Sequence, residues 1–122
     1  MGGEFLSSKN EFGQYLRQLR EKHSPFISQE TLGKLIGRDK MTISLLECGK
    51  NDPPQGVLLA KIAEVLGLDE HEKIILFDYA AIPRGTVPID ILEYFNEHKE
   101  LRNAIRRAQK KRLTDADWQK MI

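Results

Sequence analysis

The chain has 122 residues, of which 40% are hydrophobic and 30% are charged, and its formal net charge is +1 at pH 7. This length accommodates one compact core, the single cysteine excludes an internal disulfide framework and favours a reducing compartment, and no apolar stretch is long enough to span a membrane. A net charge of +1 also excludes a polycation that coats nucleic acid over its whole surface.

Charge is distributed unevenly along the chain. Residues 1–50 have a net charge of +2, residues 51–100 of −6 and residues 101–122 of +5. The sequence therefore predicts a mildly basic first half, an acidic middle and a strongly basic tail. We expect residues 1–10 to be a leader segment or a disordered arm ahead of the first helix.

The first helix is predicted over residues 11–23. Phe12, Tyr15, Leu16 and Leu19 follow the spacing i, i+3, i+4, i+7, which places them on one helical face. Nothing in the chain indicates a confident β-strand, so the predicted fold class is all-α.

Residues 28–47 have the pattern of two short helices joined by a sharp turn. Ser28 can cap the first helix, and Gly37 can end it because glycine adopts the left-handed conformation at little cost. Gly33 faces the second helix, where a missing side chain lets two backbones approach closely. The apolar stripe predicted to face the core consists of Leu32, Leu35 and Ile36.

The second of these helices is predicted over residues 40–48, with Asp39 as its cap and Gly49 at its end. Ile43 and Leu46 point inward on a helical wheel. The outward face is formed by Met41, Ser44, Leu45 and Cys48, with Lys40 and Thr42 at its flanks.

Two more helices are predicted before a linker. One covers residues 57–66, and the other follows Asp69 as far as residue 79. Residues 82–88 have the composition of a linker. The apolar anchors expected in the second of these helices are Ile74, Ile75 and Phe77.

Beyond the linker, apolar residues at helical spacing predict one or two helices, and Pro88 suits a first helical turn. Thr114 and Asp117 form a capping-box pattern before a short last helix. That helix carries three side chains that belong either to a core or to contacts with another subunit or a partner, namely Trp118, Met121 and Ile122.

The basic segment 99–112 has three interpretations. It could be a second DNA contact, a face that docks on the acidic middle, or a solvated helix. We favour the last two together, because the segment of charge −6 offers a partner within the chain.

The motif at residues 28–47 resembles the helix-turn-helix of the lambda repressor and Cro-type family, also called the XRE family. The similarity spans roughly residues 12–77. It implies a five-helix lambda-repressor-like DNA-binding domain over residues 11–81 and a helical extension over residues 82–122 for dimerisation or partner binding. The residues that carry the resemblance are Gln29, Gly33, Gly37, Ile43 and the closing Glu47-Cys48-Gly49-Lys50.

The resemblance implies a function as well as a fold. It indicates a sequence-specific transcriptional regulator, a dimeric repressor that inserts helix 40–48 into the major groove of a palindromic operator in double-stranded DNA. Such a protein acts in the cytoplasm, at the nucleoid, and is encoded by a bacterium or a phage. Two alternatives stay open: an antitoxin that represses its own operon, and an interaction adaptor that has lost DNA reading.

The predicted DNA contacts combine this resemblance with the chemistry of the outward side chains. Lys40 can donate to guanine and Ser44 to several bases, whereas Met41 and Leu45 can pack on thymine methyl groups or belong to a protein–protein surface. The predicted base-reading residues are Lys40, Met41, Thr42, Ser44 and Leu45, and the predicted phosphate-binding residues are Gln29, Arg38, Gly49, Lys50 and Asn51.

The resemblance also implies an ion pair between Arg20 and Glu47 that ties the first helix to the recognition helix. Enzymatic chemistry finds little support, since the chain has no phosphate-cradling glycine loop and no recognisable nucleophile motif. We expect no metal and no cofactor, because the residues that could bind zinc lack its spacing, namely His23, His71, His98 and Cys48.

Overall fold

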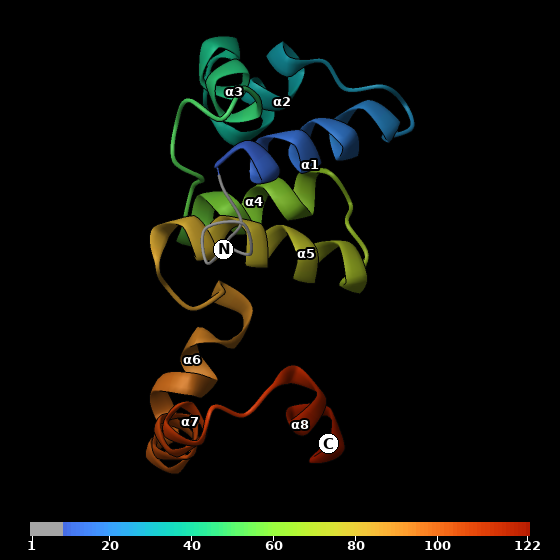
Figure 1. Cartoon of the computed structure of the whole chain (residues 1–122). Coiled ribbons are helices and arrows are strands. Elements are labelled where there is room, and N and C mark those ends of the chain that lie inside the picture. The colour runs from blue at the N-terminus through green and yellow to red at the C-terminus, as the bar shows by residue number, and fades with distance from the viewer. Residues whose placement is uncertain (1–8) are drawn as a thin grey trace. The chain divides into compact units, whose positions relative to one another are not determined.

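The computed structural model describes residues 9–122, so most of the predicted leader or arm lies outside the described residues. Within residues 9–122 every regular element is helical and no strand occurs, which confirms the all-α prediction. Figure 1 shows the elements, which are α1 (Lys9–Lys22), α2 (Gln29–Ile36), α3 (Lys40–Glu47), α4 (Gly56–Val65), α5 (Glu70–Ala81), the 3-10 helix η2 (Ile82–Arg84), α6 (Ile89–Glu97), α7 (Lys99–Lys111) and α8 (Asp115–Lys120).

The chain divides into two compact units, one that runs to Asp90 and one that covers Ile91–Ile122. The division falls inside α6, near its first turn. The first unit therefore holds α1–α5 and η2, and the second holds most of α6 together with α7 and α8.

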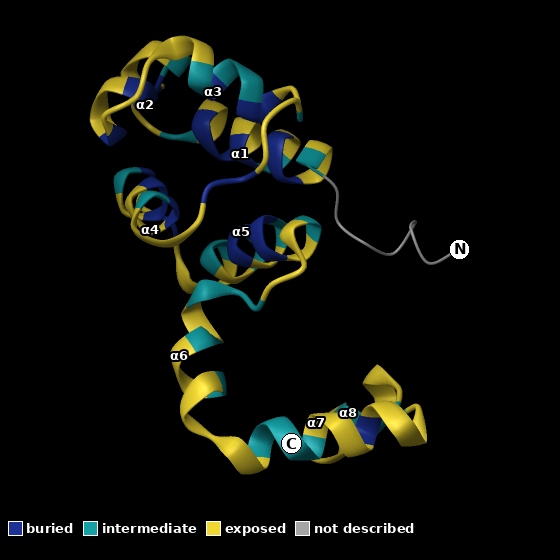
Figure 2. Cartoon of the chain, turned by 90° about the vertical axis from the view of Figure 1, so that its left-hand side faces the viewer, coloured by how far each residue is buried: buried dark blue, intermediate teal, exposed yellow. Residues whose placement is uncertain are grey.

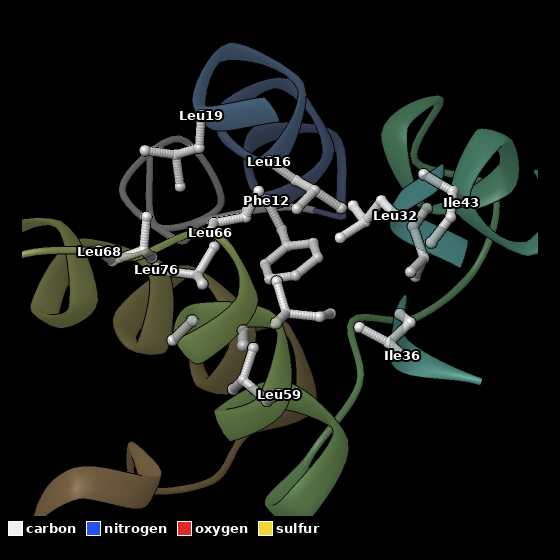
Figure 3. Packing of buried hydrophobic residues seen from close by; sticks show 14 of the residues in the cluster. Phe12, Leu16, Leu19, Leu32, Ile36, Ile43, Leu59, Leu66, Leu68 and Leu76 are labelled. Carbon is white, nitrogen blue, oxygen red and sulfur yellow. The ribbon is translucent and has the colours of Figure 1, made fainter. Parts of the chain in front are cut away.

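The first unit is built around one apolar core to which all five of its α-helices contribute. Phe12 lies at the centre of the view in Figure 3, between Leu16 of α1 and Leu59 of α4. Figure 2 shows that the buried residues gather on the inward faces of these helices. The largest side chains that are almost completely buried are Phe12, Leu16, Leu32, Ile43, Pro53, Leu59, Ile62 and Leu76.

Two predicted core positions are wrong. Leu35 is 46% exposed, because the buried face of α2 is formed by Leu32, Ile36 and the glycine between them. Ile74 is also 46% exposed, and Leu76, which was not among the predicted anchors, is fully buried in its place. Both errors arise in helices with apolar residues on several sides, where only the packing of neighbouring helices decides which face turns inward.

The start of α5 is tied to the end of α1. Asp69 and Glu72 form a reciprocal capping box, so the predicted cap at Asp69 is confirmed. Lys22 Nζ lies 2.6 Å from Glu72 Oε2. The hydrogen bond from Lys22 holds the pKa of the Glu72 carboxyl below its usual value, assisted by the backbone N–H of Asp69.

The segment predicted as a linker begins with ordered structure. Ile82–Arg84 forms η2, which ends at Gly85 in the left-handed conformation with a φ of 67°. Arg84 Nε donates to the carbonyl oxygen of Pro53 at 2.6 Å, which attaches this turn to the loop before α4.

The second unit consists of helices with few buried side chains. Arg102 Nη1 donates to the carbonyl oxygens of Phe95 at 2.9 Å and Asn96 at 2.6 Å, so that it satisfies the last turn of α6. The predicted capping box at Thr114 and Asp117 is confirmed at the start of α8. The only described residue of this unit that is classed as buried is Ala108, whereas its exposed large apolar residues are Ile91, Tyr94, Ile105, Met121 and Ile122.

Candidate nucleic-acid interface

The turn between α2 and α3 forms as the sequence predicts. Ser28 Oγ accepts a hydrogen bond from the Thr31 N–H at 3.0 Å, and Gly37 ends α2 with a φ of 76°. Asp39 Oδ1 accepts from the Thr42 N–H at 2.8 Å. The hydrogen bond from the Thr42 backbone N–H and, second, the one from the Thr42 hydroxyl hold the pKa of the Asp39 carboxyl below its usual value.

Gly33 allows the close approach of backbones that the turn needs. A Cβ atom at this position would lie 2.8 Å from the carbonyl oxygen of Arg38 and 3.0 Å from that of Asp39. The first distance is shorter than carbon–oxygen contact permits and the second is at its lower limit, so the close approach of α2 and α3 depends on a residue without a side chain.

Gly13 has the same role between α1 and α3, and the sequence alone did not identify it. A Cβ atom there would lie 2.6 Å from the carbonyl oxygen of Glu47. The available signal was a glycine inside a strongly periodic helix. Glycine lowers helix stability at such a position, so its presence indicates that packing requires it. The end of α3 therefore rests directly on the backbone of α1.

Arg20 and Glu47 hold the same two helices together with a buried ion pair. Arg20 Nε lies 2.7 Å from Glu47 Oε2 and Arg20 Nη2 lies 2.9 Å from Glu47 Oε1. Arg20 Nη1 donates to the carbonyl oxygen of Ile27 at 3.1 Å. The hydrogen bond to Glu47 raises the pKa of the Arg20 guanidinium above its usual value.

Gln29 joins this pair from the start of α2. Its Nε2 donates to Glu47 Oε1 at 2.9 Å, and its side chain is half-buried. An amide nitrogen carries two hydrogens, so one remains for a phosphate oxygen. Glu47 thus positions a predicted phosphate-binding residue as well as the recognition helix.

The outward face of α3 brings together three of the five predicted base-reading residues. Lys40, Met41 and Ser44 line one open hollow, together with Lys34 and Arg38. The side chain of Met41 is 63% exposed. This surface thus combines three cations, a hydroxyl group and an apolar thioether with the carboxylates of Glu30 and Asp39.

The other two predicted base-reading residues are placed differently. The Thr42 hydroxyl donates to Asp39 Oδ1 at 2.9 Å, so its hydrogen belongs to the helix cap. Leu45 is half-buried and does not line the hollow. The outward face of α3 is therefore less apolar than its sequence implies.

The predicted phosphate-binding residues after α3 offer side chains rather than backbone N–H groups. The N–H of Gly49 donates to the Leu46 carbonyl at 3.2 Å, and the N–H groups of Lys50 and Asn51 both donate to the Leu45 carbonyl. The side chains of Lys50 and Asn51 are exposed. Arg38 is exposed too, and one of its donors, Nη1, binds the Gly37 carbonyl at 3.0 Å.

Comparison with known proteins identifies the fold that carries this surface. The family model of the helix-turn-helix domain matches residues 11–73, which is more than half of the chain. The chain belongs to the helix-turn-helix domain family. This helix-turn-helix protein is an XRE-type, DNA-binding transcriptional regulator, as the sequence resemblance predicted.

The helix-turn-helix regulator also matches a solved structure, the restriction-modification controller protein C.AhdI from Aeromonas hydrophila. The two are 34% identical, and the match covers 52% of this chain and 88% of that chain with a TM-score of 0.45. No curated protein matches the chain.

Lys34 and Glu30 are surface residues of the regulator that sequence reasoning did not select. Both line the hollow beside α3. Lys34 lies outside the apolar stripe of α2 and near the turn, and this position was the signal that could have identified it. The hollow thus receives cations from both helices of the motif.

Within residues 9–122 no three His, Cys, Asp or Glu residues gather in a way that could hold a metal ion. None of the helices in this range is long and apolar enough to cross a membrane.

Proposed function

We propose that the chain is a homodimeric repressor that inserts α3 into the major groove of a palindromic operator and blocks access to a promoter. The observation that carries this proposal is the single open surface formed by Lys40, Met41 and Ser44 next to Lys34 and Arg38. A recognition helix must present such a surface at its first turns, because these enter the groove most deeply.

Each side chain on this surface suits a different feature of DNA. Lys40 donates to the O6 and N7 acceptors of guanine, and Ser44 exchanges hydrogen bonds with several bases. Met41 packs on the methyl group of thymine. Leu45 and Thr42 are assigned smaller roles, since one is half-buried and the other donates its hydroxyl hydrogen to Asp39.

The phosphate contacts flank this surface. Gln29, Arg38, Lys50 and Asn51 present amide or cationic donors, which fix the register of the protein on the duplex and carry no sequence information. Gly49 contributes by its conformation, with a φ of 76°, rather than by its N–H, which is engaged with Leu46.

Dimerisation is part of the proposal because one recognition helix contacts too few base pairs to specify an operator, whereas two related by a two-fold axis read a palindrome. The second unit supplies an apolar surface for a second copy. Met121 is 62% exposed and Ile122 is fully exposed. Residues 82–122 thus serve as the dimer arm, with Trp118, Met121 and Ile122 among its contacts.

Two lysines separate base reading from phosphate binding. Lys40→Ala is expected to relax the preference at one base pair by about 1 to 3 kcal/mol, because the guanine contact is lost. Lys50→Ala is expected to weaken binding to all sequences alike and to reduce the salt slope by about 1, because one phosphate contact is lost.

The measurement is a titration of operator duplexes that carry single base-pair changes, at several salt concentrations. Lys61→Ala, an exposed lysine on α4, is the control of equal charge and should behave as the wild type. Equal effects of Lys40→Ala and Lys50→Ala on every duplex would refute the assignment of Lys40 to base reading.

A second candidate is an antitoxin, whose extension binds and neutralises a partner protein while the head represses their shared operon. The exposed apolar residues of the second unit fit this role as well as they fit dimerisation, because a partner protein would cover them as a second copy would. A protein that co-purifies with the chain through residues 82–122 would favour the antitoxin. In either role the chain is a non-enzymatic regulator that acts at the bacterial nucleoid, in the cytoplasm.

A further inference from the structure

The positive charge of the chain does not lie in the unit that carries the helix-turn-helix. Residues 1–90 have a net charge of −2, whereas residues 91–122 have a net charge of +3. DNA is a polyanion, and the salt-dependent part of DNA affinity comes from cations that neutralise phosphates. The first unit, whose net charge is negative, therefore gains less affinity from phosphate neutralisation than a DNA-binding domain usually does.

The surplus is concentrated on one helix. α7 carries six Lys or Arg residues and a single acidic residue, Glu100. At 100° per residue the cations occupy one broad face of α7, and its apolar residues lie opposite. The apolar side consists of Leu101, Ala104, Ile105 and Ala108.

Some cations of this basic face already form hydrogen bonds within the unit. Arg102 caps the carbonyl groups at the end of α6, and Arg106 Nη1 donates to Asn103 Oδ1 at 2.8 Å. Arg107, Lys110 and Lys111 are exposed, and no ion pair within residues 9–122 involves them. Arg107 and Lys111 lie one turn apart on α7.

We propose that the basic face of α7 is a second DNA-binding site, which binds the phosphate backbone of the duplex through Arg107, Lys110 and Lys111. The proposal rests on the proposed function, because α3 must first hold the chain on DNA. Once α3 is bound, α7 belongs to the same complex and meets phosphates at a high effective concentration. The site adds affinity and carries no base preference.

DNA fits this face better than the acidic middle of the chain does. A duplex presents one negative charge per roughly 1.7 Å of its axis. The carboxylates of the first unit are fewer than the phosphates of a duplex. Several of them already accept hydrogen bonds within the unit, as Asp69 and Glu72 do in the capping box of α5.

The test compares two double variants that remove the same charge. Arg107→Gln with Lys111→Gln removes two cations from α7, and Lys61→Gln with Lys73→Gln removes two from α4 and α5. Affinity is measured between 50 and 200 mM salt on two duplexes, the operator alone and the operator with about one helical turn of DNA added at each end. Glutamine preserves helix propensity, and circular dichroism checks the helical content.

On the longer duplex, the α7 variant is expected to reduce the salt slope by about 2, so that the wild type loses about tenfold more affinity than the variant across this salt range. The control variant should match the wild type. Arg107→Lys with Lys111→Arg keeps both charges and should retain the slope. On the operator alone, the α7 variant and the wild type are expected to differ less than on the longer duplex.

Equal slopes for the wild type and the α7 variant on the longer duplex, with sequence preference intact, would overturn the α7 site and leave the proposed function standing. An equal loss of slope in the control variant would also overturn it, because general charge rather than α7 would be responsible. Absence of binding by the wild-type protein to either duplex would overturn the proposed function and the α7 site together.

Discussion

Replacement of Glu47 by alanine is expected to lower the free energy of unfolding by about 3 to 5 kcal/mol. The substitution leaves the Arg20 guanidinium buried, with an exposed fraction of 5%, and without the carboxylate that accepts from its Nε and Nη2. It also removes the acceptor of the Gln29 amide. The measurement is chemical denaturation followed by circular dichroism.

Glu21→Ala is the matched control, because it removes a carboxylate from the exposed pair between Arg17 and Glu21. This change should cost no more than about 0.5 kcal/mol. Arg20→Met combined with Glu47→Leu should recover most of the stability, since a buried pair replaced by apolar side chains leaves no charge without a partner. A Glu47→Ala variant as stable as Glu21→Ala would show that the pair does not hold α1 and α3 together.

Gly13→Ala is expected to lower the free energy of unfolding by about 1 to 3 kcal/mol, although alanine favours a helix interior by up to about 1 kcal/mol relative to glycine. The new Cβ would lie 2.6 Å from the carbonyl oxygen and 2.8 Å from the carbonyl carbon of Glu47. These are backbone atoms, which cannot move aside as a flexible side chain can. The end of α3 must therefore shift away from α1, and affinity for DNA should fall with stability.

The control for this prediction is Gln14→Ala, at the next position of α1. Gln14 is exposed, so its substitution tests helix propensity without a change in packing. It should alter the free energy of unfolding by less than about 0.5 kcal/mol. If Gly13→Ala were more stable than the wild type, as propensity alone predicts, the close contact between α1 and α3 would be refuted.

The sequence predicted those features that depend on neighbours along the chain. The caps at Ser28, Asp39 and Thr114 each need one side-chain oxygen and an N–H three residues later, and all three form. The left-handed end of α2 at Gly37 is equally local. Such features can be inferred from residue type and spacing because no distant contact is involved.

Features that depend on packing were harder to predict. Leu35 and Ile74 fit an apolar stripe in their own helices, yet each is exposed, because the neighbouring helices cover a different face. Gly13 and Lys34 acquire their roles only when α3 lies beside α1 and α2. The pairing of Arg20 with Glu47, 27 positions later, followed from the family resemblance and not from periodicity.

The proposed DNA-binding surface of α3 also has features that the sequence predicts and features that depend on packing. The position of α3 in the motif, and the residues of α3 that face outward, could be inferred from sequence. The degree of exposure could not, because it depends on the α2–α3 turn: Met41 is open to solvent, whereas Leu45 is half-buried. Met41 and Leu45 were the residues that could belong to a protein–protein surface instead. Of these two, Met41 is the one that is open to solvent.

Selection of bound sequences from a random duplex library is the most direct test of the claim that α3 reads an operator. The full chain, shown to be folded and dimeric, is used at moderate salt so that phosphate contacts alone do not retain every duplex. If α3 reads an operator, one palindromic motif with half-sites about one helical turn apart is enriched, and its preference at one base pair is lost with Lys40→Ala. Recovery of no enriched motif would contradict this claim and favour an adaptor that has kept the fold and lost DNA reading.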